Sequence, residues 1–298
     1  MNEMMTTQEV ADYLRVRQRK IYELVRLRRI PCSRITGKWL FPKAMIDLWV
    51  LQNAETLADA MPVRPPPLIL GGSHDPLLEW AVHQSDCGLA QLACGSLEGL
   101  ARLARGDVMA AGCHVYEAET KTFNQATAQR LLVGHGMVLI TWAWRRQGLI
   151  VAAGNPLGLS SLADLAPTDG PRPRLVTRQA AAGSTILLRH LAEVAGIDGD
   201  SLNSGAVPAR THSDMAAAIL RGEADAGLGV EAAAAPFGLD FVPLFRERFD
   251  LAMRRRDYFA DPVQRLLAFA GGPQFDGHAA GLHGYDTGEL GRVVWNDR

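Results

Sequence analysis

The sequence predicts an α/β protein with two parts: a small, basic N-terminal unit and a larger domain in which strands and helices alternate. Three observations predict this class. The first fifty residues carry two short helical patterns and then a hairpin pattern. A proline run follows at Pro62-Val63-Arg64-Pro65-Pro66-Pro67. Beyond that run, short apolar segments alternate with helical segments, which is the pattern of an α/β sheet domain.

Length and composition support two globular units. The chain has 298 residues, of which 48% are hydrophobic and 21% are charged, and this composition is typical of folded domains. No apolar run approaches the roughly 18 residues that a membrane-spanning helix needs. The Met-Asn-Glu start lacks the basic and apolar regions of a signal peptide. We therefore expect a cytoplasmic protein.

The cysteines form no Cys-x-x-Cys pair. They are Cys32, Cys87, Cys94 and Cys113. A reducing cytosol keeps such side chains as thiols. We therefore expect small buried hydrophobic groups rather than a metal or redox site.

Positive charge is concentrated near the N-terminus, although the chain as a whole is balanced, with 31 Lys and Arg against 32 Asp and Glu. Between Arg15 and Lys43 there are 10 basic residues and a single acidic one, Glu23. Such an excess is the electrostatic footprint of a nucleic-acid-binding module. An ordinary solvated basic face would have the same composition, so charge alone does not decide.

Two short amphipathic helices are predicted within this basic region. Thr6 stands where a helix would begin, and Glu9 follows it at the spacing of a capping box. A short break at Arg15 to Arg17 separates the first helix from the second. The apolar positions of the two helices repeat at helical spacing: Val10, Ala11, Leu14, Ile21, Leu24 and Val25. Two such helices in succession, the second basic on its exposed face, are the helix-turn-helix pattern.

A hairpin and a last helix are predicted next. Ile30-Pro31 ends the helical region, and apolar residues then alternate around a Gly37-Lys38 turn. Pro42 opens a further helix over residues 43–51. The side chains expected to face inward are Ile35, Trp39, Phe41, Met45, Ile46 and Trp49. The hairpin would be the wing of a winged helix-turn-helix.

These residues resemble a known family. The matching strings are Thr7-Gln8-Glu9-Val10-Ala11, Ile21-Tyr22, Ile30-Pro31, Gly37-Lys38-Trp39-Leu40-Phe41-Pro42 and Ile46-Asp47-Leu48-Trp49. They resemble the excisionase-like branch of MerR-type winged DNA-binding domains. The resemblance implies a double-stranded DNA operator as partner, with a recognition helix in the major groove and a wing near phosphates. The residues it implies for DNA contact are Arg17, Gln18, Arg19, Lys20, Tyr22, Arg26, Arg34 and Lys38.

The rest of the chain is predicted to hold a linker and a second domain. We place the winged helix-turn-helix at residues 1–55, a proline-rich linker at 56–67, and a ligand-sensing domain at 68–298. A proline run favours stiff, extended geometry, which suits a spacer. In the second domain, strands interleaved with helices imply largely parallel sheets, whose ligands collect at strand ends near helix N-termini.

The order of these elements resembles the periplasmic binding proteins of the second type, used here as a cytoplasmic sensor. The strings that carry it are Gly71-Gly72-Ser73-His74-Asp75, Gly95-Ser96-Leu97-Glu98-Gly99-Leu100, Ala182-Gly183-Ser184-Thr185, Thr211-His212-Ser213-Asp214-Met215-Ala216 and Gly222-Glu223-Ala224-Asp225-Ala226-Gly227-Leu228-Gly229. The resemblance implies two lobes joined by hinge strands near 148–154 and 243–251. Lobe 1 would comprise 68–147 and 250–298, and lobe 2 would comprise 150–245.

A cleft between such lobes would be lined by small polar side chains. Each small hydroxyl among them is predicted to lie at the start of a helix, where free N–H groups and the helix dipole favour an anion, although an ordinary N-cap explains any single one. The residues predicted to contact ligand are Ser73, His74, Ser96, Leu97, Ser184, Thr185, Thr211, His212 and Ser213. No cofactor, metal or catalytic residue is predicted.

The architecture resembles regulators linked to molybdate and tungstate homeostasis, which implies one of these oxyanions as effector. Hydroxyls and amides can hold such an ion without burying a full countercharge. The sequence leaves an organic anion open, because Arg178, Arg210 and the neighbouring His74, His114 and His212 would suit one equally well. An operator-binding homodimer is expected, since winged proteins usually read paired half-sites.

Two other classes of function fit the sequence less well. An α/β enzyme is disfavoured because the sequence has no Gly-x-Ser-x-Gly elbow, no phosphate-binding Gly-x-x-x-x-Gly-Lys loop and no helical pair of metal-spaced histidines. A recombination accessory protein would fit the excisionase resemblance. It would leave the large second domain unexplained.

Overall fold

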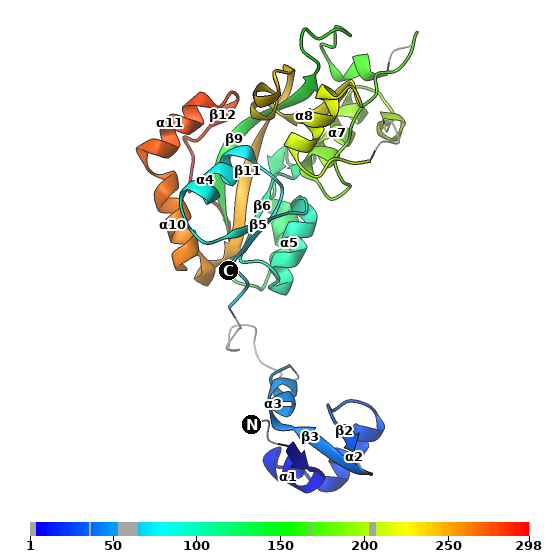
Figure 1. Ribbon diagram of the computed structural model, residues 1–298, viewed down its shortest axis with the longest axis vertical. Coiled ribbons are helices and arrows are strands. Elements are labelled where there is room, and N and C mark those ends of the chain that lie inside the picture. The colour runs from blue at the N-terminus through cyan, green and yellow to red at the C-terminus, as the bar shows by residue number, and fades with distance from the viewer. Residues whose placement is uncertain (1–3, 36, 53–64, 167–168, 203–206, 298) are drawn as a thin grey trace. The chain divides into compact units, whose positions relative to one another are not determined.

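The computed structural model describes residues 4–35, 37–52, 65–166, 169–202 and 207–297. The chain divides into two compact units, Met1–Val63 and Arg64–Arg298, coloured blue and cyan to red in Figure 1. The predicted linker at 56–67 lies outside the described residues as far as residue 64. No helix in the described part is long and apolar enough to cross a membrane.

The first unit is a three-helix, three-strand domain over its described residues. Its elements are β1 (Met4–Thr6), α1 (Thr7–Tyr13), α2 (Gln18–Arg26), β2 (Ser33–Ile35), β3 (Lys38–Pro42) and α3 (Lys43–Gln52). The strands form an antiparallel sheet in the order β1-β3-β2. The predicted capping box is confirmed: the Glu9 N–H donates to Thr6 Oγ1 at 3.3 Å, and the Thr6 N–H donates to Glu9 Oε2 at 2.6 Å.

The core of this unit contains most of the predicted apolar positions. Val10, Ile21, Phe41 and Ile46 are all fully buried. The expectation for Met45 was wrong, because its side chain is 52% exposed, while its neighbour Ile46 occupies the inward face of α3. Strand β1 was not predicted either. It has three residues, too few for a period-2 pattern to stand out.

The second unit has the alternating pattern expected of an α/β domain. Its first half comprises β4 (Ile69–Gly72), α4 (Pro76–Gln84), β5 (Ala90–Ala93), α5 (Ser96–Arg105), β6 (Ala110–Cys113), β7 (Tyr116–Glu117), β8 (Thr122–Phe123), α6 (Gln125–Leu132) and β9 (Met137–Val151). Its second half comprises α7 (Gly183–Val194), α8 (His212–Leu220), β10 (Ala226–Val230), β11 (Asp240–Arg254), α9 (Arg255–Tyr258), α10 (Asp261–Ala270), α11 (Pro273–Gly281), β12 (Tyr285–Asp286) and β13 (Val293–Asn296). Short 3-10 helices at Leu162–Leu165, Gly199–Leu202, Glu231–Ala233 and Ala235–Phe237 complete the described elements.

One eight-stranded sheet runs through the whole unit in the order β10-β9-β11-β6-β4-β5, and β12 and β13 also pair with β9. The prediction of largely parallel pairing was wrong. Parallel pairing joins β4 to β5 and to β6, and two isolated parallel bridges join Leu175 to Ala226 and Arg178 to Ala209. The 15-residue strands β9 and β11 run antiparallel to each other. These two long strands take the place of the short hinge strands that were predicted near 148–154 and 243–251.

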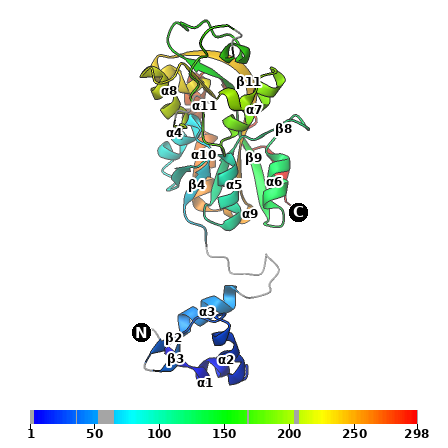
Figure 2. The same cartoon turned by 90° about the vertical axis from the view of Figure 1, so that its right-hand side faces the viewer.

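The described core residues of this unit form four hydrophobic clusters, two in a first lobe and two in a second lobe. In the first lobe, α4, α10 and α11 pack on one face of the sheet around Trp142 and Phe249, and α5 and α6 cover the other face. In the second lobe, α7 packs against Leu149 and Leu228. Helix α8 packs against Ile150 in a neighbouring cluster. Figure 2 shows the two lobes one above the other, joined by β9 and β11.

Candidate functional site

Helix α2 presents the basic side chains that the sequence predicted for DNA contact. Ile21 and Val25 face the core, so the opposite face of the helix is turned to solvent. The exposed residues on or next to this helix are Arg17, Gln18, Arg19, Lys20, Tyr22 and Arg26. Of these, Lys20 forms an ion pair with Glu23 at 2.9 Å. Arg and Gln side chains on one helical face can reach base edges in a major groove.

The hairpin β2–β3 presents the other two side chains predicted to contact DNA, Arg34 and Lys38. Arg34 is exposed and its guanidinium lies 5.4 Å from the ring centroid of Trp39. Lys38 is exposed at the start of β3, next to Gly37, whose φ of +84° suits the tight turn. Thr36 in this turn lies outside the described residues. Charged groups at a hairpin tip can hold phosphates without reading sequence.

In the second unit, four polar segments meet where the lobes face each other. Ser73 and His74 follow β4, and Ser96 is the first residue of α5; both belong to the first lobe. Ser184 lies in the first turn of α7 and His212 begins α8, both in the second lobe. All five side chains are buried. Helix N-termini of both lobes therefore point polar groups at one boundary.

The lobes are in direct contact at this boundary. The Leu97 N–H donates across it to the Ala181 carbonyl at 3.2 Å, and the His212 N–H lies 3.5 Å from His74 Nδ1. A Cβ atom at Gly183 would lie 2.5 Å from the His114 carbonyl oxygen, so this approach requires glycine. The structure is that of a closed pair of lobes.

The serine hydroxyls differ in what they contact. Ser73 Oγ and Ser96 Oγ share a hydrogen bond of 2.9 Å, and Ser96 Oγ accepts a second one from the His114 N–H at 3.1 Å. Ser184 Oγ is buried and has no hydrogen-bond partner among the described residues. A buried hydroxyl without a partner carries a desolvation cost, which a bound ligand or water would relieve.

Other predicted contact residues have their polar groups occupied within the protein. Thr185 Oγ1 is within 3.0 Å of the carbonyl oxygens of Arg178 and Gln179 and donates there. Thr211 Oγ1 caps α8 by accepting from the Asp214 N–H at 2.9 Å. Ser213 is half-buried. The helix start predicted at Ser73 was wrong, because Asp75 is the N-cap of α4.

A buried ion-pair network that was not predicted from the sequence lies beside the serines. Arg145 Nε donates to Glu247 Oε1 at 2.6 Å, and Arg145 Nη1 donates to Asp75 Oδ2 at 2.6 Å. The second Glu247 oxygen is 2.8 Å from His114 Nδ1, and Gln147 Nε2 donates to the first at 2.8 Å. Arg145 and Glu247 are direct partners in the β9–β11 register. The signal in the sequence was an arginine and a glutamate within two long apolar strands.

The network controls the charge of its members. Burial alone would raise the pKa of Glu247, but the charges of Arg145 and His114 outweigh this effect and lower it to about 2. The carboxylate is therefore ionised at neutral pH. Burial lowers the pKa of His114, and the neighbouring Glu247 only partly offsets this. The side chains of Asp75 and Glu247 thus share the guanidinium of Arg145.

Arg178 is a second buried cation, on the side of the second lobe. Its Nε donates to the Ala209 carbonyl at 3.0 Å and its Nη2 to the Arg210 carbonyl at 2.5 Å. Burial and the charge of Arg145 lower its pKa to about 10, although the charge of Asp214 acts in the opposite direction. Arg178 therefore stays charged at neutral pH and braces the segment that leads into α8.

Several buried polar atoms near the boundary have no hydrogen-bond partner among the described residues. They are Arg145 Nη2, Gln147 Oε1, Ser184 Oγ, and both ring nitrogens of His212. Native proteins satisfy most buried polar groups, so a cluster of exceptions marks a place for ligand or water. Both lobes contribute to this cluster. The site is accordingly suited to an occupant that touches both.

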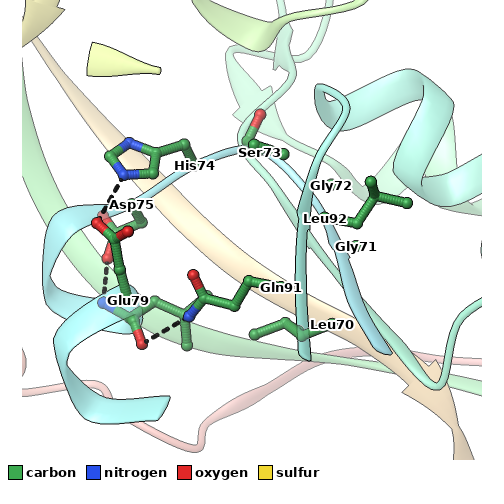
Figure 3. Close-up of a pocket in the computed structure, with 11 residues that line it drawn as sticks. Leu70, Gly71, Gly72, Ser73, His74, Asp75, Glu79, Gln91 and Leu92 are labelled. Carbon is green, nitrogen blue, oxygen red and sulfur yellow. Dashed lines mark hydrogen bonds and ion pairs between the residues drawn. The ribbon is translucent and has the colours of Figure 1, made fainter. Parts of the chain in front are cut away.

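A small pocket opens beside the Ser73–His74 segment, as Figure 3 shows. His74 Nε2 is 3.0 Å from Glu79 Oε2 on α4, and Gln91 of β5 donates to the Leu78 carbonyl. The pocket volume is about 20 Å³, enough for one water molecule. Within the described part of the chain, no group of three or more His, Cys, Asp or Glu side chains is arranged to hold a metal ion.

A helix-turn-helix unit and a two-lobed α/β ligand-binding unit thus make up one chain. The chain belongs to the PBP superfamily, whose domain model matches residues 79–271, and a helix-turn-helix domain model matches residues 4–54. This pairing indicates a ligand-responsive regulator and is typical of binding proteins rather than enzymes. The winged helix-turn-helix and binding-protein fold predicted from the sequence is confirmed.

Two relatives share sequence with the chain. It is 26% identical to the uncharacterized protein YvgK of Bacillus subtilis (strain 168) over 308 aligned residues, which cover 97% of each chain. It is 30% identical over 110 residues to an uncharacterized protein in the ferredoxin 2Fe-2S gene 5′ region of Clostridium pasteurianum. That match covers 37% of this chain and 97% of the relative.

Solved structures share the fold of the second unit. A putative phosphate ABC transporter substrate-binding protein with bound phosphate from Clostridium perfringens matches with a TM-score of 0.52 and 12% identity, covering 72% of this chain and 97% of that one. The sulfate-binding protein SubI of Mycobacterium tuberculosis matches with a TM-score of 0.51 and 15% identity, covering 74% and 86%. At these identities the likeness establishes the fold alone.

Proposed function

We propose that the protein is a one-component transcription regulator that binds an operator through α2 and the β2–β3 hairpin and a small oxyanion between the lobes. The observation that carries the second part is the set of buried, unpartnered polar atoms at the lobe boundary, above all Ser184 Oγ and the His212 ring. They lie in the first turns of α7 and α8, where the helix dipole favours negative charge.

The electrostatics favour an anion on the side of the second lobe. Arg178 contributes a positive charge that backbone carbonyls alone contact within the described residues. The first lobe supplies Ser73 and Ser96, whose hydroxyls can reorient to donate.

Among small oxyanions we propose molybdate or tungstate. The support is the resemblance of the whole architecture to regulators of molybdate and tungstate homeostasis, together with a site of hydroxyls and helix N-termini suited to tetrahedral oxyanions. Phosphate and sulfate, named for the two structurally similar proteins, are the matched competitors. We further propose that the regulator is a homodimer acting in the cytoplasm, where its DNA lies.

Replacement of Ser184 by Ala tests the ligand site. We expect calorimetry with molybdate, tungstate, sulfate and phosphate to detect binding of at least one of them by the wild-type chain. Ser184→Ala should weaken it roughly 10-fold to 100-fold, the loss of one hydrogen bond to a charged group. Ser85→Ala is the control, because its hydroxyl donates to Val82 on the far end of α4. If none of the four anions binds, the oxyanion assignment is wrong, and binding of an organic acid in a thermal-shift panel would replace it.

Coupling between the two units tests the regulatory role. A ligand shifts an open and closed equilibrium only by its difference in affinity for the two states. We expect saturating ligand to change operator affinity at least about fivefold, and DNA to change ligand affinity by the same factor, because linkage is reciprocal. Fluorescence anisotropy with and without ligand measures the first, and calorimetry with operator present measures the second. Equal operator affinity in both conditions would contradict regulation through DNA affinity.

A further inference from the structure

His212 is the most unusual side chain of the lobe boundary. It begins α8, its side chain is fully buried, and neither ring nitrogen has a hydrogen-bond partner in the described part of the chain. Its ring centroid is 5.9 Å from that of His74, in the opposite lobe. A neutral imidazole has one donor and one acceptor nitrogen, whereas an imidazolium has two donors. The ring therefore has hydrogen-bonding capacity that the protein itself does not use.

The charged and titratable groups that face His212 come from both lobes. Arg178 approaches from the segment before α7, Arg145 from β9, and the His74 and His114 rings from the first lobe. Carboxylates close by are already engaged: Asp75 and Glu247 bind Arg145, and Glu79 binds His74. On the outer side, Asp214 closes the α8 capping box, and Glu231, after β10, pairs with Arg146.

These surroundings keep the free site from holding a proton on His212. Burial, followed by the charges of Arg178 and Arg145, places the pKa of His212 well below its usual range. The ring is therefore neutral at physiological pH in the ligand-free chain. An anion placed against the ring would reverse the local field, since an opposite charge nearby favours the protonated form.

We propose that the cleft takes up its anion together with a proton, and that His212 receives the proton. This inference rests on the proposed oxyanion site and adds the way in which that site is regulated. The proton comes from solvent and converts the unpartnered acceptor nitrogen into a second donor. The imidazolium then supplies a countercharge in the second lobe beside Arg178. Solution pH thereby becomes a second input to the sensor.

The sign of the pH dependence follows from linkage. The anion-bound state has the higher His212 pKa, so it holds more protons than the free state at any pH between the two pKa values. In that range, affinity for the anion rises as pH falls, by up to about tenfold per pH unit for one proton. Above the bound-state pKa the affinity is flat. A site built of hydroxyls and amides alone would show no such dependence.

The test is calorimetry of the full chain at pH 6.0 with molybdate and with sulfate, each in two buffers whose ionisation enthalpies differ. Neither oxyanion carries a proton at this pH, so a buffer-dependent enthalpy reports a proton taken up by the protein. We expect uptake approaching one proton per bound anion. The His212→Gln variant should lose most of that uptake and keep measurable binding. His83→Gln is the matched control, because His83 is exposed on α4.

The outcomes separate the inference from the proposed function. Binding with the same enthalpy in both buffers would overturn proton uptake and leave the oxyanion site intact. Uptake that persists in His212→Gln would assign the proton to His74 or His114 and overturn the role of His212. If the variant does not fold, the ring resonances of the wild-type histidines on anion addition identify the protonated ring by NMR. No binding of either anion would count against the proposed function itself.

Discussion

Replacing Arg145 by Met should cost about 3 to 5 kcal/mol of the free energy of unfolding, because it removes the cation from two buried carboxylates. Asp75 and Glu247 each contact Arg145 at 2.6 Å and are almost fully buried. Methionine keeps the length of the side chain over the Phe249 ring, where the guanidinium lies 4.4 Å from the centroid. Urea unfolding followed by tryptophan fluorescence measures the change.

A neighbouring arginine provides the control for this experiment. Arg146 is next in β9, but its side chain is 50% exposed and pairs with Glu231. Arg146→Met should therefore change stability by less than about 1 kcal/mol. The combined variant R145M/D75N/E247Q should recover much of the loss, since it leaves no buried charge in the network. Equal effects of Arg145→Met and Arg146→Met would contradict the importance of this network.

The pH dependence of the same variant has a definite sign. In the wild-type chain Glu247 has a pKa of about 2, against 4.5 for the same group free in solution. Its contribution to stability is therefore present above pH 4.5 and is lost as pH falls toward 2. Without Arg145, burial favours the protonated carboxyl. The deficit of Arg145→Met should consequently shrink as the pH is lowered.

Changing Arg17, Arg19 and Lys20 to Ala together should reduce specific operator affinity by about a thousandfold or more. Each contact of a basic side chain to a base edge or phosphate contributes roughly tenfold to operator affinity. The losses from three such side chains should multiply. All three side chains are exposed at the start of α2. Because they lie outside the core of the unit, the fold should be retained, which circular dichroism can confirm. Anisotropy with an operator fragment gives the affinity.

The matched control removes three exposed arginines from the second unit: Arg221, Arg265 and Arg292. It alters the net charge by the same amount and should leave operator affinity within a few fold. The wing residue Lys38 should behave differently from the helix residues. Lys38→Ala is expected to weaken all DNA sequences alike, because a phosphate contact carries no sequence information. An unchanged footprint after the triple substitution would show that α2 is not the recognition helix.

The elements of the first unit could be predicted because local signals mark their ends. Thr6 and Glu9 fix the start of α1, and Gly37 fixes the hairpin turn. The same holds for α4 (Pro76–Gln84), because Asp75 and Pro76 mark its start. The pairing of β9 with β11 could not be predicted. It joins segments about a hundred residues apart, and no local pattern encodes such a partner.

The small polar residues of the candidate site could be predicted from the sequence, but its buried ion pairs could not. Ser96 and Ser184 stand at helix starts, which sequence reveals, and the structure brings them to one boundary. Their contact with a ligand stays a prediction. Thr185 and Thr211 carry the same signal, yet their hydroxyls bind backbone groups within their own segments. Arg145 and Glu247 become ion-pair partners because the β9–β11 register places them opposite each other, and this register depends on tertiary structure.

The continuity of β9 and β11 determines how the lobes can separate. Both strands pass from one lobe to the other without a break, and their shared ladder shifts register between Pro243 and Phe245 and between Phe249 and Asp250. A two-stranded ribbon of this kind bends elastically and keeps its ladder of hydrogen bonds. Opening would therefore bend both strands along their length rather than rotate the lobes about a single hinge residue. Its restoring force would increase with angle, and the energy stored in the open form would become available again when the lobes close on a ligand.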